Sequence, residues 1–425
     1  MYHPDSEHSA DTRSQTVAVI GAGVVGLCTA LEAQRRGYQV TLIDRDQPGL
    51  GASYGNAGYL ATELIDPLST LKTLKSAPAM WLNPHGPLAI PLGYLHRIAP
   101  WLLRFVAAAL PRNAQRSQQG LQALNRASVA AWERCLEDIG ATEQLVRSGY
   151  LLVWESAAKL DQAKTHARYL AEQGIRTELV MGERLAQLEP ALAETSHHAL
   201  YFPDASRVQE PYRLCMQLYA AFKARGGYFL QQAVEAVSLS GNEVSLETTG
   251  GALAFGRAIV CAGAWSKSLL QSVGIEVPLE AERGYHLTID ARTGLLNHPI
   301  GSAERRFVMT PLESGLRVVG FTELGGLARQ PQPRRFRSLR HHSRALLTPL
   351  KDESLATSEW MGHRPTLPDS LPVIDMHPDH SQLLFAFGNQ HLGLTQAAIT
   401  AEMVVALMTG DEPSIDPEPF RVDRF

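Results

Sequence analysis

The pattern of apolar and polar positions between residues 16 and 45 predicts a strand, a helix and a second strand. Val17–Ile20 is a short apolar run rich in β-branched residues, which is typical of a buried parallel strand. Leu27–Arg36 is amphipathic and predicts a helix that ends at Gly37. Gln39–Ile43 is a second apolar run and predicts the next strand. The stretch is therefore expected to form one βαβ unit.

Three glycines connect the first strand to the helix. Gly21, Gly23 and Gly26 have the spacing G-x-G-x-x-G, and Asp44 ends the second strand. In dinucleotide-binding proteins these glycines permit a tight turn, a close approach to a pyrophosphate and helix packing, while the acid accepts a ribose hydroxyl. The amides at the helix N-terminus face the phosphates. Because a carboxylate would repel a 2′-phosphate, the pattern disfavours NADP, but it leaves NAD and FAD open.

Further elements follow the same kinds of pattern. Strands are predicted at Gly149–Trp154, at Ala233–Leu239 and Glu243–Thr248 around a turn, and at Ala258–Cys261. Gln209–Arg225 has helical periodicity, and Leu383–Gly410 predicts a strand, a glycine-rich turn and a long helix.

Length, charge and cysteine usage narrow the class of protein. A chain of 425 residues suggests two domains, and 45% hydrophobic with 19% charged residues is ordinary for a soluble globular protein. The net charge of -4 argues against a general nucleic-acid binder. Four cysteines without a CxxC pair fit reduced thiols, and we expect no metal site. Residues 1–13 are expected to form a disordered tail, and neither a signal peptide nor a transmembrane helix is evident.

The motifs VIGAGVVG, GASYGNAG, YFPDASRVQEPYRL, IVCAGAWS, RGYHLTI, GHRPTLPDSLPVI and GNQHLGLT extend the pattern along nearly the whole chain from Thr16. With them the chain resembles the FAD-dependent amine and amino-acid oxidoreductases, the family of D-amino acid oxidase, glycine oxidase and sarcosine oxidase. Within that family it is most similar to bacterial D-amino acid dehydrogenases. The resemblance implies FAD, and because no cysteine follows Cys261, we expect it to be held non-covalently.

The resemblance also implies an α/β fold with two interleaved domains. A Rossmann-like FAD-binding domain, with a parallel sheet and a small antiparallel sheet, is expected at residues 14–78, 190–275 and 362–425. A substrate-binding α+β domain, built on a mainly antiparallel sheet, is expected at residues 79–189 and 276–361.

Three side chains are the candidates for substrate chemistry. Flavin chemistry requires that the substrate C–H bond be held over the ring, and an arginine can clamp an amino-acid carboxylate in two-point contact. The resemblance assigns that role to Arg364, with a structural arginine paired with Asp369 or Asp375 as the alternative. Tyr285 would bind the carboxylate or cover the pocket, unless it is a core tyrosine. His391 would lie near the ring or pack behind it.

The resemblance carries a larger set of residues over to the cofactor. The predicted FAD-binding residues are Gly21, Gly23, Val24, Val25, Gly26, Asp44, Arg45, Ser53, Asn56, Ala57, Gly58, Val234, Ala262, Gly263, Gly388, Leu392, Gly393, Leu394 and Thr395.

Residues 67–132 have an unusual charge pattern. They contain no Asp or Glu but carry seven Lys and Arg residues, together with several aromatic residues. Basic residues beside interfacial aromatics suit an anionic membrane surface. The alternative is an ordinary helical layer with acidic neighbours. We therefore expect a cytoplasmic protein, with a peripheral location on the inner face of the cytoplasmic membrane as the hypothesis to test.

The expected function is FAD-dependent oxidative deamination of small D-amino acids, with electrons passed to a quinone or another acceptor. A dehydrogenase or oxidase of 4-hydroxy-D-proline or of sarcosine-type secondary amines is a close alternative. A flavoprotein subunit that transfers electrons without an amino-acid substrate of its own is an alternative of another class.

Overall fold

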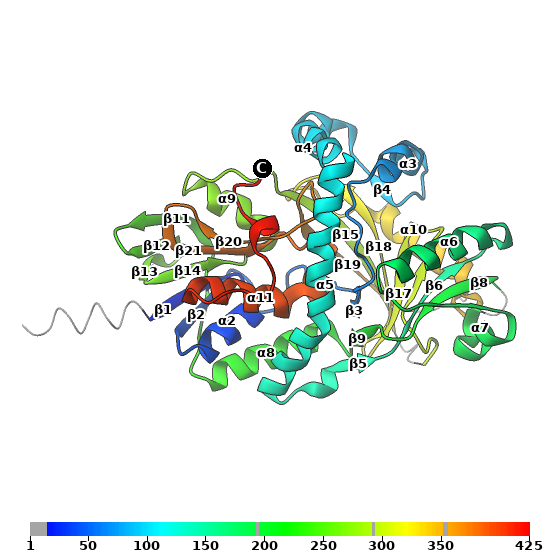
Figure 1. The fold of residues 1–425 in the computed structure, drawn as a ribbon, viewed down its shortest axis with the longest axis horizontal. Coiled ribbons are helices and arrows are strands. Elements are labelled where there is room, and N and C mark those ends of the chain that lie inside the picture. The colour runs from blue at the N-terminus through cyan, green and yellow to red at the C-terminus, as the bar shows by residue number, and fades with distance from the viewer. Residues whose placement is uncertain (1–14, 193–194, 291–293, 352–355) are drawn as a thin grey trace, which may run out of the picture.

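The computed structural model describes residues 15–192, 195–290, 294–351 and 356–425. Two large sheets lie at opposite sides of the molecule, and the long helix α5 (Pro111–Ile139) crosses between them (Figure 1). The predicted tail at residues 1–13 lies outside the described residues.

The first sheet has six strands and contains the predicted βαβ unit. Its strand order is β10-β2-β1-β14-β21-β20, and all pairs are parallel except β20 with β21. The strands are β10 (Tyr228–Gln231), β2 (Gln39–Asp44), β1 (Thr16–Ile20), β14 (Arg257–Val260), β21 (His380–Phe387) and β20 (Val373–His377). This is the expected Rossmann-like arrangement, in which helices cover a buried parallel sheet.

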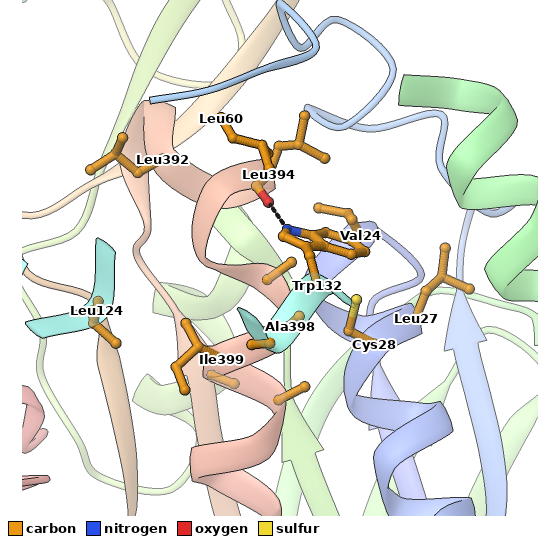
Figure 2. Packing of buried hydrophobic residues seen from close by; sticks show 14 of the residues in the cluster. Val24, Leu27, Cys28, Leu60, Leu124, Trp132, Leu392, Leu394, Ala398 and Ile399 are labelled. Carbon is orange, nitrogen blue, oxygen red and sulfur yellow. Dashed lines mark hydrogen bonds between the residues drawn. The ribbon is translucent and has the colours of Figure 1, made fainter. Parts of the chain in front are cut away.

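Three helices pack beside this sheet because their sequences are apolar over much of their surface. They are α2 (Val24–Arg35), α8 (Pro211–Ala224) and α11 (Gly393–Thr409). Helix α11 packs against both α2 and α5. Figure 2 shows the centre of this core, where the fully buried Trp132 of α5 donates its indole N–H to the Leu394 carbonyl oxygen at 2.8 Å. This hydrogen bond fixes the start of α11 against α5.

The second sheet has nine strands and is mainly antiparallel. Its main path is β19-β15-β18-β17-β16-β6-β8-β7, and β4 (Leu88–Ala89) pairs with β18. The other strands are β19 (Thr357–Thr366), β15 (Glu280–Ile289), β18 (Gly315–Leu324), β17 (Phe307–Leu312), β16 (Ile300–Ser302), β6 (Tyr150–Trp154), β8 (His198–Phe202) and β7 (Glu178–Met181). Helix α10 (Pro333–Leu346) covers β15 and β18, while α6 (Leu160–Glu172) and α7 (Gly182–Leu188) pack near β7 and β8.

Small elements complete the fold. One antiparallel sheet contains β11 (Val234–Ser240), β12 (Glu243–Thr248) and β13 (Gly251–Phe255). A second joins β3 (Tyr59–Leu60), β9 (Ser206–Val208) and β5 (Leu145–Arg147). The remaining helices of four residues or more are α9 (Ser266–Gln271), α3 (Leu71–Leu82) and α4 (Leu95–Ala108) in the described ranges, apart from short 3₁₀ turns.

The predicted fold class is confirmed, with two differences in detail. The sequence pattern predicted two strands at residues 233–248, but the sheet has a third, β13, whose alternation is interrupted by small residues. The domain division stays a prediction. Strand β8 and residues 362–366 of β19 were expected in the FAD-binding domain, but they pair within the nine-stranded sheet. Strand pairing over long distances decides such boundaries.

One helical segment of the described chain, Gln390–Thr409, is long and apolar enough to cross a membrane. In an 18-residue apolar window of this segment, 78% is buried, and α11 packs against α2 and α5, which is the placement of a core helix.

Candidate active site

A cavity of about 1740 Å³ extends from the β1–α2 turn to the nine-stranded sheet. Its walls come from the loop at residues 51–57, strands β15 and β19, and the turn at residues 388–394. A cavity of this kind, with apolar walls and a few convergent polar groups, is the usual form of a cofactor and substrate site.

The nucleotide end of the cavity is built on the glycine turn. Gly21 has φ +109, and an added Cβ on Gly26 would stand 1.8 Å from the Gly21 carbonyl oxygen, so α2 approaches the turn as closely as a glycine allows. No side chain caps α2, but the Ser53 Oγ accepts the Val24 N–H at 2.9 Å. Gly23, Val24 and Val25 at the start of the helix line the cavity, and a helix N-terminus suits a phosphate group.

Asp44 is held in place beside this turn. Its two carboxylate oxygens accept the Ala22 N–H at 2.7 Å and the Asp46 N–H at 3.0 Å. Burial raises the pKa of Asp44 above its ordinary value, although these backbone N–H groups oppose the shift. The neighbouring Arg45 lies 3.9 Å above the Trp265 ring. Val234, at the start of β11, lines the same end of the cavity, as predicted for a residue near adenine.

The loop at residues 51–58 is held by side chains that sequence reasoning did not select. The buried Arg317 donates to the carbonyl oxygens of Tyr54 and Asn56 at 3.0 Å each and pairs with Glu210 at 3.2 Å. The His286 Nδ1 lies 3.2 Å from the Gly55 carbonyl oxygen. Burial lowers the pKa of His286 to about 3, so that it is neutral. Only the pairing of β15 with β18 reveals this support, because no motif contains these residues together.

Arg364 lies in the cavity and is oriented by a buried acid. Its Nη1 donates to the Glu282 Oε1 at 2.8 Å and to the Phe321 carbonyl oxygen at 3.1 Å, across the β15–β19 pairing. Within the described part of the chain, the Nε and Nη2 groups of Arg364 have no hydrogen-bond partner. The alternative partners do not reach Arg364, because Asp369 pairs with Arg424 and Asp375 accepts the Val422 N–H.

Glu282 remains charged because its surroundings favour the anion. Burial disfavours its charged form, but the Arg364 guanidinium, the nearby His391 and the Thr322 hydroxyl hold its pKa below the ordinary value. The Thr366 hydroxyl donates to the second oxygen at 3.0 Å. With Nη1 fixed by the anion, Nε and Nη2 lie beside Gly284, which lines the cavity together with Arg364.

Comparison with known proteins identifies the family. Residues 16–407 match the family model described as FAD dependent oxidoreductase. The chain belongs to this family. It is 32% identical over 415 residues to a D-amino-acid oxidase of Bradyrhizobium diazoefficiens, covering 96% of this chain and 98% of that one. It is 29% identical to D-amino acid dehydrogenase 2 of Ralstonia nicotianae, covering 96% and 100%. The fold matches glycine oxidase from Geobacillus kaustophilus with a TM-score of 0.74 at 21% identity, covering 96% and 98%.

The cofactor of this FAD dependent oxidoreductase is FAD, as predicted, and the residues present fit it. The close packing of Gly26 leaves the α2 amides open, and Asp44 stands at the ribose position of the motif. The cavity continues past Ala262, Gly263 and the loop at residues 51–57 to Gly388, and its volume of about 1740 Å³ is large enough for a dinucleotide. FAD, when bound, supplies a ring that accepts a hydride.

Most of the predicted residues line this cavity, and four do not. Gly26, Gly58, Leu392 and Thr395 are absent from its walls. Thr395 instead accepts the Ala61 N–H through its Oγ1 at 3.0 Å, and Leu392 is buried in the core. These four support the walls by packing.

The other two candidates for substrate chemistry are Tyr285 and His391, and neither offers a free charged group to the cavity. The Tyr285 hydroxyl donates to the Glu323 Oε2 at 2.7 Å and accepts the Gln332 N–H at 3.3 Å, so its polar atom is already used. His391 lies near Glu282 and Arg364, and burial lowers its pKa to about 4. It is therefore neutral near pH 7. Tyr285 borders the cavity as part of a buried cluster that includes Phe336.

One further acid lines the cavity and was not predicted. Burial raises the pKa of the Glu63 carboxyl to about 7. Its Oε2 is buried and has no hydrogen-bond partner among the described residues. A sequence pattern offers no signal for this residue, because its environment comes from Tyr59 and Tyr150, which stack at 4.3 Å in the folded chain.

Proposed function

We propose that this FAD-dependent oxidoreductase oxidises the Cα–N bond of small D-amino acids. The observation that carries the proposal is the Arg364 guanidinium, which lies in the cavity with Nε and Nη2 unpartnered by any described residue. Two parallel N–H donors match the geometry of a carboxylate. The D configuration and the primary amine are supported by the names of the relatives at 32% and 29% identity.

Arg364 would act by orientation. Its free N–H groups would donate to the substrate carboxylate, while the ion pair to Glu282 at 2.8 Å keeps the guanidinium from rotating away. Gly284 makes this position available, because an added Cβ there would stand 2.4 Å from the Arg364 Cζ. A substrate held at its carboxylate presents one Cα–H bond in a constant direction, which lowers the entropic part of the barrier.

Proton transfer would need little from the protein. The reaction removes a hydride from Cα and a proton from nitrogen, and it leaves an imine that water hydrolyses to a 2-oxo acid and ammonia. His391 is neutral and buried, but its depressed pKa of about 4 makes it a weak base. We therefore assign His391 to the wall of the site and expect the amine to be deprotonated before the hydride leaves.

An anaerobic titration tests the proposal. The purified yellow protein is mixed without oxygen with a panel of D-amino acids, their L enantiomers and several imino acids, and the visible flavin absorbance is followed. Loss of that absorbance with D-amino acids, and much slower loss with L enantiomers, is the expected result. Loss with imino acids or sarcosine alone would replace the proposal with a secondary-amine substrate. No loss with any compound would refute substrate oxidation and favour an electron-transfer subunit.

A further inference from the structure

Helices α3 and α4 carry exposed apolar side chains where a soluble domain normally has few. Both helices project at the same edge of the molecule (Figure 1). Leu82 is 76% exposed, Leu92 is 74% exposed and Leu103 is 73% exposed. Helix α3 has no buried residue at all within Leu71–Leu82. We call the exposed residues Leu71, Trp81, Leu82, Leu92, Leu103, Val106 and Leu110 the α3–α4 face. Several large apolar side chains exposed on neighbouring segments of the chain favour an interaction site.

The charged residues within residues 67–132 are all positive. Five exposed cations have no ion pair or hydrogen bond among the described residues, namely Lys72, Lys75, Arg97, Arg104 and Arg112. Of the seven cations at residues 67–132, Arg116 alone has an acidic partner in the described structure, Glu418 at 2.7 Å. No ion pair therefore joins these five cations to an acid among the described residues.

The inner sides of the same helices line one end of the cavity. Leu74, Ala77 and Met80 of α3 and Leu102 and Phe105 of α4 contribute apolar walls. The buried Trp101 also lines this end, and its indole N–H has no acceptor among the described residues. The cavity therefore has a polar end at Arg364 and an apolar end that lies directly behind the α3–α4 face.

We propose that the α3–α4 face docks on an anionic lipid bilayer and brings the apolar end of the cavity to the membrane. The occupant follows from chemistry, because leucine and tryptophan side chains insert at the lipid interface while unpaired lysines and arginines attract anionic headgroups. A protein partner would need acidic and apolar patches of matching shape, whereas a bilayer supplies both properties without a specific shape.

Docking would give the proposed oxidation a lipid-dissolved acceptor, and this part rests on the proposed function. The amino acid loses a hydride from Cα and a proton from nitrogen. A membrane quinone would gain these two electrons and two protons and become the quinol. The apolar walls suit the quinone ring, and the free Trp101 N–H suits one of its carbonyl oxygens.

Vesicle sedimentation with the FAD-loaded full chain tests the docking. We would compare vesicles of equal parts phosphatidylglycerol and phosphatidylcholine with vesicles of phosphatidylcholine alone, at low and at high salt. The wild type is expected to bind the anionic vesicles, and binding should weaken as salt rises. Neutralising Lys75→Gln and Arg104→Gln together should reduce binding by about thirtyfold, from about 1 kcal/mol for each cation near the surface.

Apolar contacts are tested with Leu82→Ser, Leu92→Ser and Leu103→Ser combined. These residues are exposed and do not line the cavity, so the variant should fold and turn over amino acids with a soluble dye at the wild-type rate. Its vesicle binding should fall about tenfold or more. The matched control replaces exposed apolar residues outside residues 67–132, Met181→Ser with Tyr228→Ser, which are 44% and 59% exposed, and it should bind like the wild type.

The outcomes separate docking from catalysis. Equal binding to anionic and neutral vesicles, or equal binding by the triple-serine variant and the wild type, would overturn the proposal. A second outcome would also overturn the proposal: the wild type does not bind vesicles but forms a dimer, and the triple-serine variant is monomeric. That result would identify the α3–α4 face as a self-association surface. Vesicle binding without D-amino acid oxidation would leave docking supported and refute the proposed function alone.

Discussion

Replacing Arg364 by leucine removes the group on which the proposed substrate orientation depends. The Nε and Nη2 groups of the guanidinium have no partner among the described residues, while Nη1 is bound to Glu282 at 2.8 Å. Leucine keeps much of the side-chain volume but offers no donor and no charge. The substitution therefore separates recognition of a carboxylate from the shape of the pocket.

The expected loss follows from the number of hydrogen bonds. A hydrogen bond to a charged group contributes about 1.5–3 kcal/mol, so two of them correspond to about 3–6 kcal/mol. This is a decrease of about two to four powers of ten in kcat/KM for a D-amino acid. The same variant leaves Glu282 buried without its cation, which costs about 3–5 kcal/mol of folding stability. FAD content should stay near the wild-type level, because the partners of Arg364, Glu282 and Phe321, are not among the predicted FAD-binding residues.

The stability loss also has an expected pH dependence. The folded-state pKa of Glu282 is below its ordinary value, so its ion pair stabilises the wild type above that value and loses this effect as pH falls. The free energy of unfolding of Arg364→Leu should therefore fall furthest below that of the wild type at neutral pH. The difference between the two should become smaller in acid. A double variant, Arg364→Leu with Glu282→Gln, removes the unpaired charge and should recover stability without recovering activity.

The assay combines steady-state turnover with a soluble dye, flavin content and urea unfolding at several pH values. The wild type and the double variant serve as controls. An Arg364→Leu protein that folds, holds FAD and keeps kcat/KM within about threefold of the wild type would refute the assignment of Arg364. Recovery of activity in the double variant would show that stability, not carboxylate binding, limited the single variant.

Three further predictions concern other positions. Gly284→Ala should raise KM at least about tenfold while FAD stays bound, because its Cβ would stand 2.4 Å from the Arg364 Cζ; an unchanged KM would count against the tight packing. Glu63→Gln should be more stable than the wild type by up to about 3 kcal/mol near pH 8 and equally stable near pH 4. The reason is that burial raises the pKa of Glu63 to about 7, so that its ionisation at higher pH destabilises the wild-type fold. Urea unfolding at the two pH values measures this difference in stability, and a difference that does not change with pH would contradict the prediction. Acid precipitation should release all flavin into the supernatant, because burial keeps the Cys261 thiol protonated with a pKa of about 12; flavin in the pellet would show covalent attachment.

The sequence pattern was sufficient to predict those helices and strands that depend on interactions between residues close together in the chain. The βαβ unit at β1, α2 and β2, the helix α8 and the strand–turn–helix around residue 390 follow from short-range periodicity and glycine positions, and the structure confirms them. The motifs that resemble the family also select Arg364, and most of the cofactor residues that they select line the cavity.

The partners of those residues could not be predicted, because they are set by strand pairing over long distances. Arg364 was considered with Asp369 or Asp375 as structural partners, but its partner is Glu282, which is brought opposite it by the register of β15 and β19. Arg317 and Glu63 likewise have no local signal, since burial and packing give them their roles. Tyr285 matched a motif, yet its hydroxyl is taken by Glu323 from the neighbouring strand β18.

By itself, the sequence determined the dinucleotide turn and its order of elements, since chain sterics and periodicity act within a few residues. It also carried the excess of positive charge at residues 67–132. Only the tertiary structure decided which charges are paired and which side chains share the cavity. Hydrogen bonding and desolvation depend on the three-dimensional neighbours of each group, which lie up to hundreds of residues away along the chain.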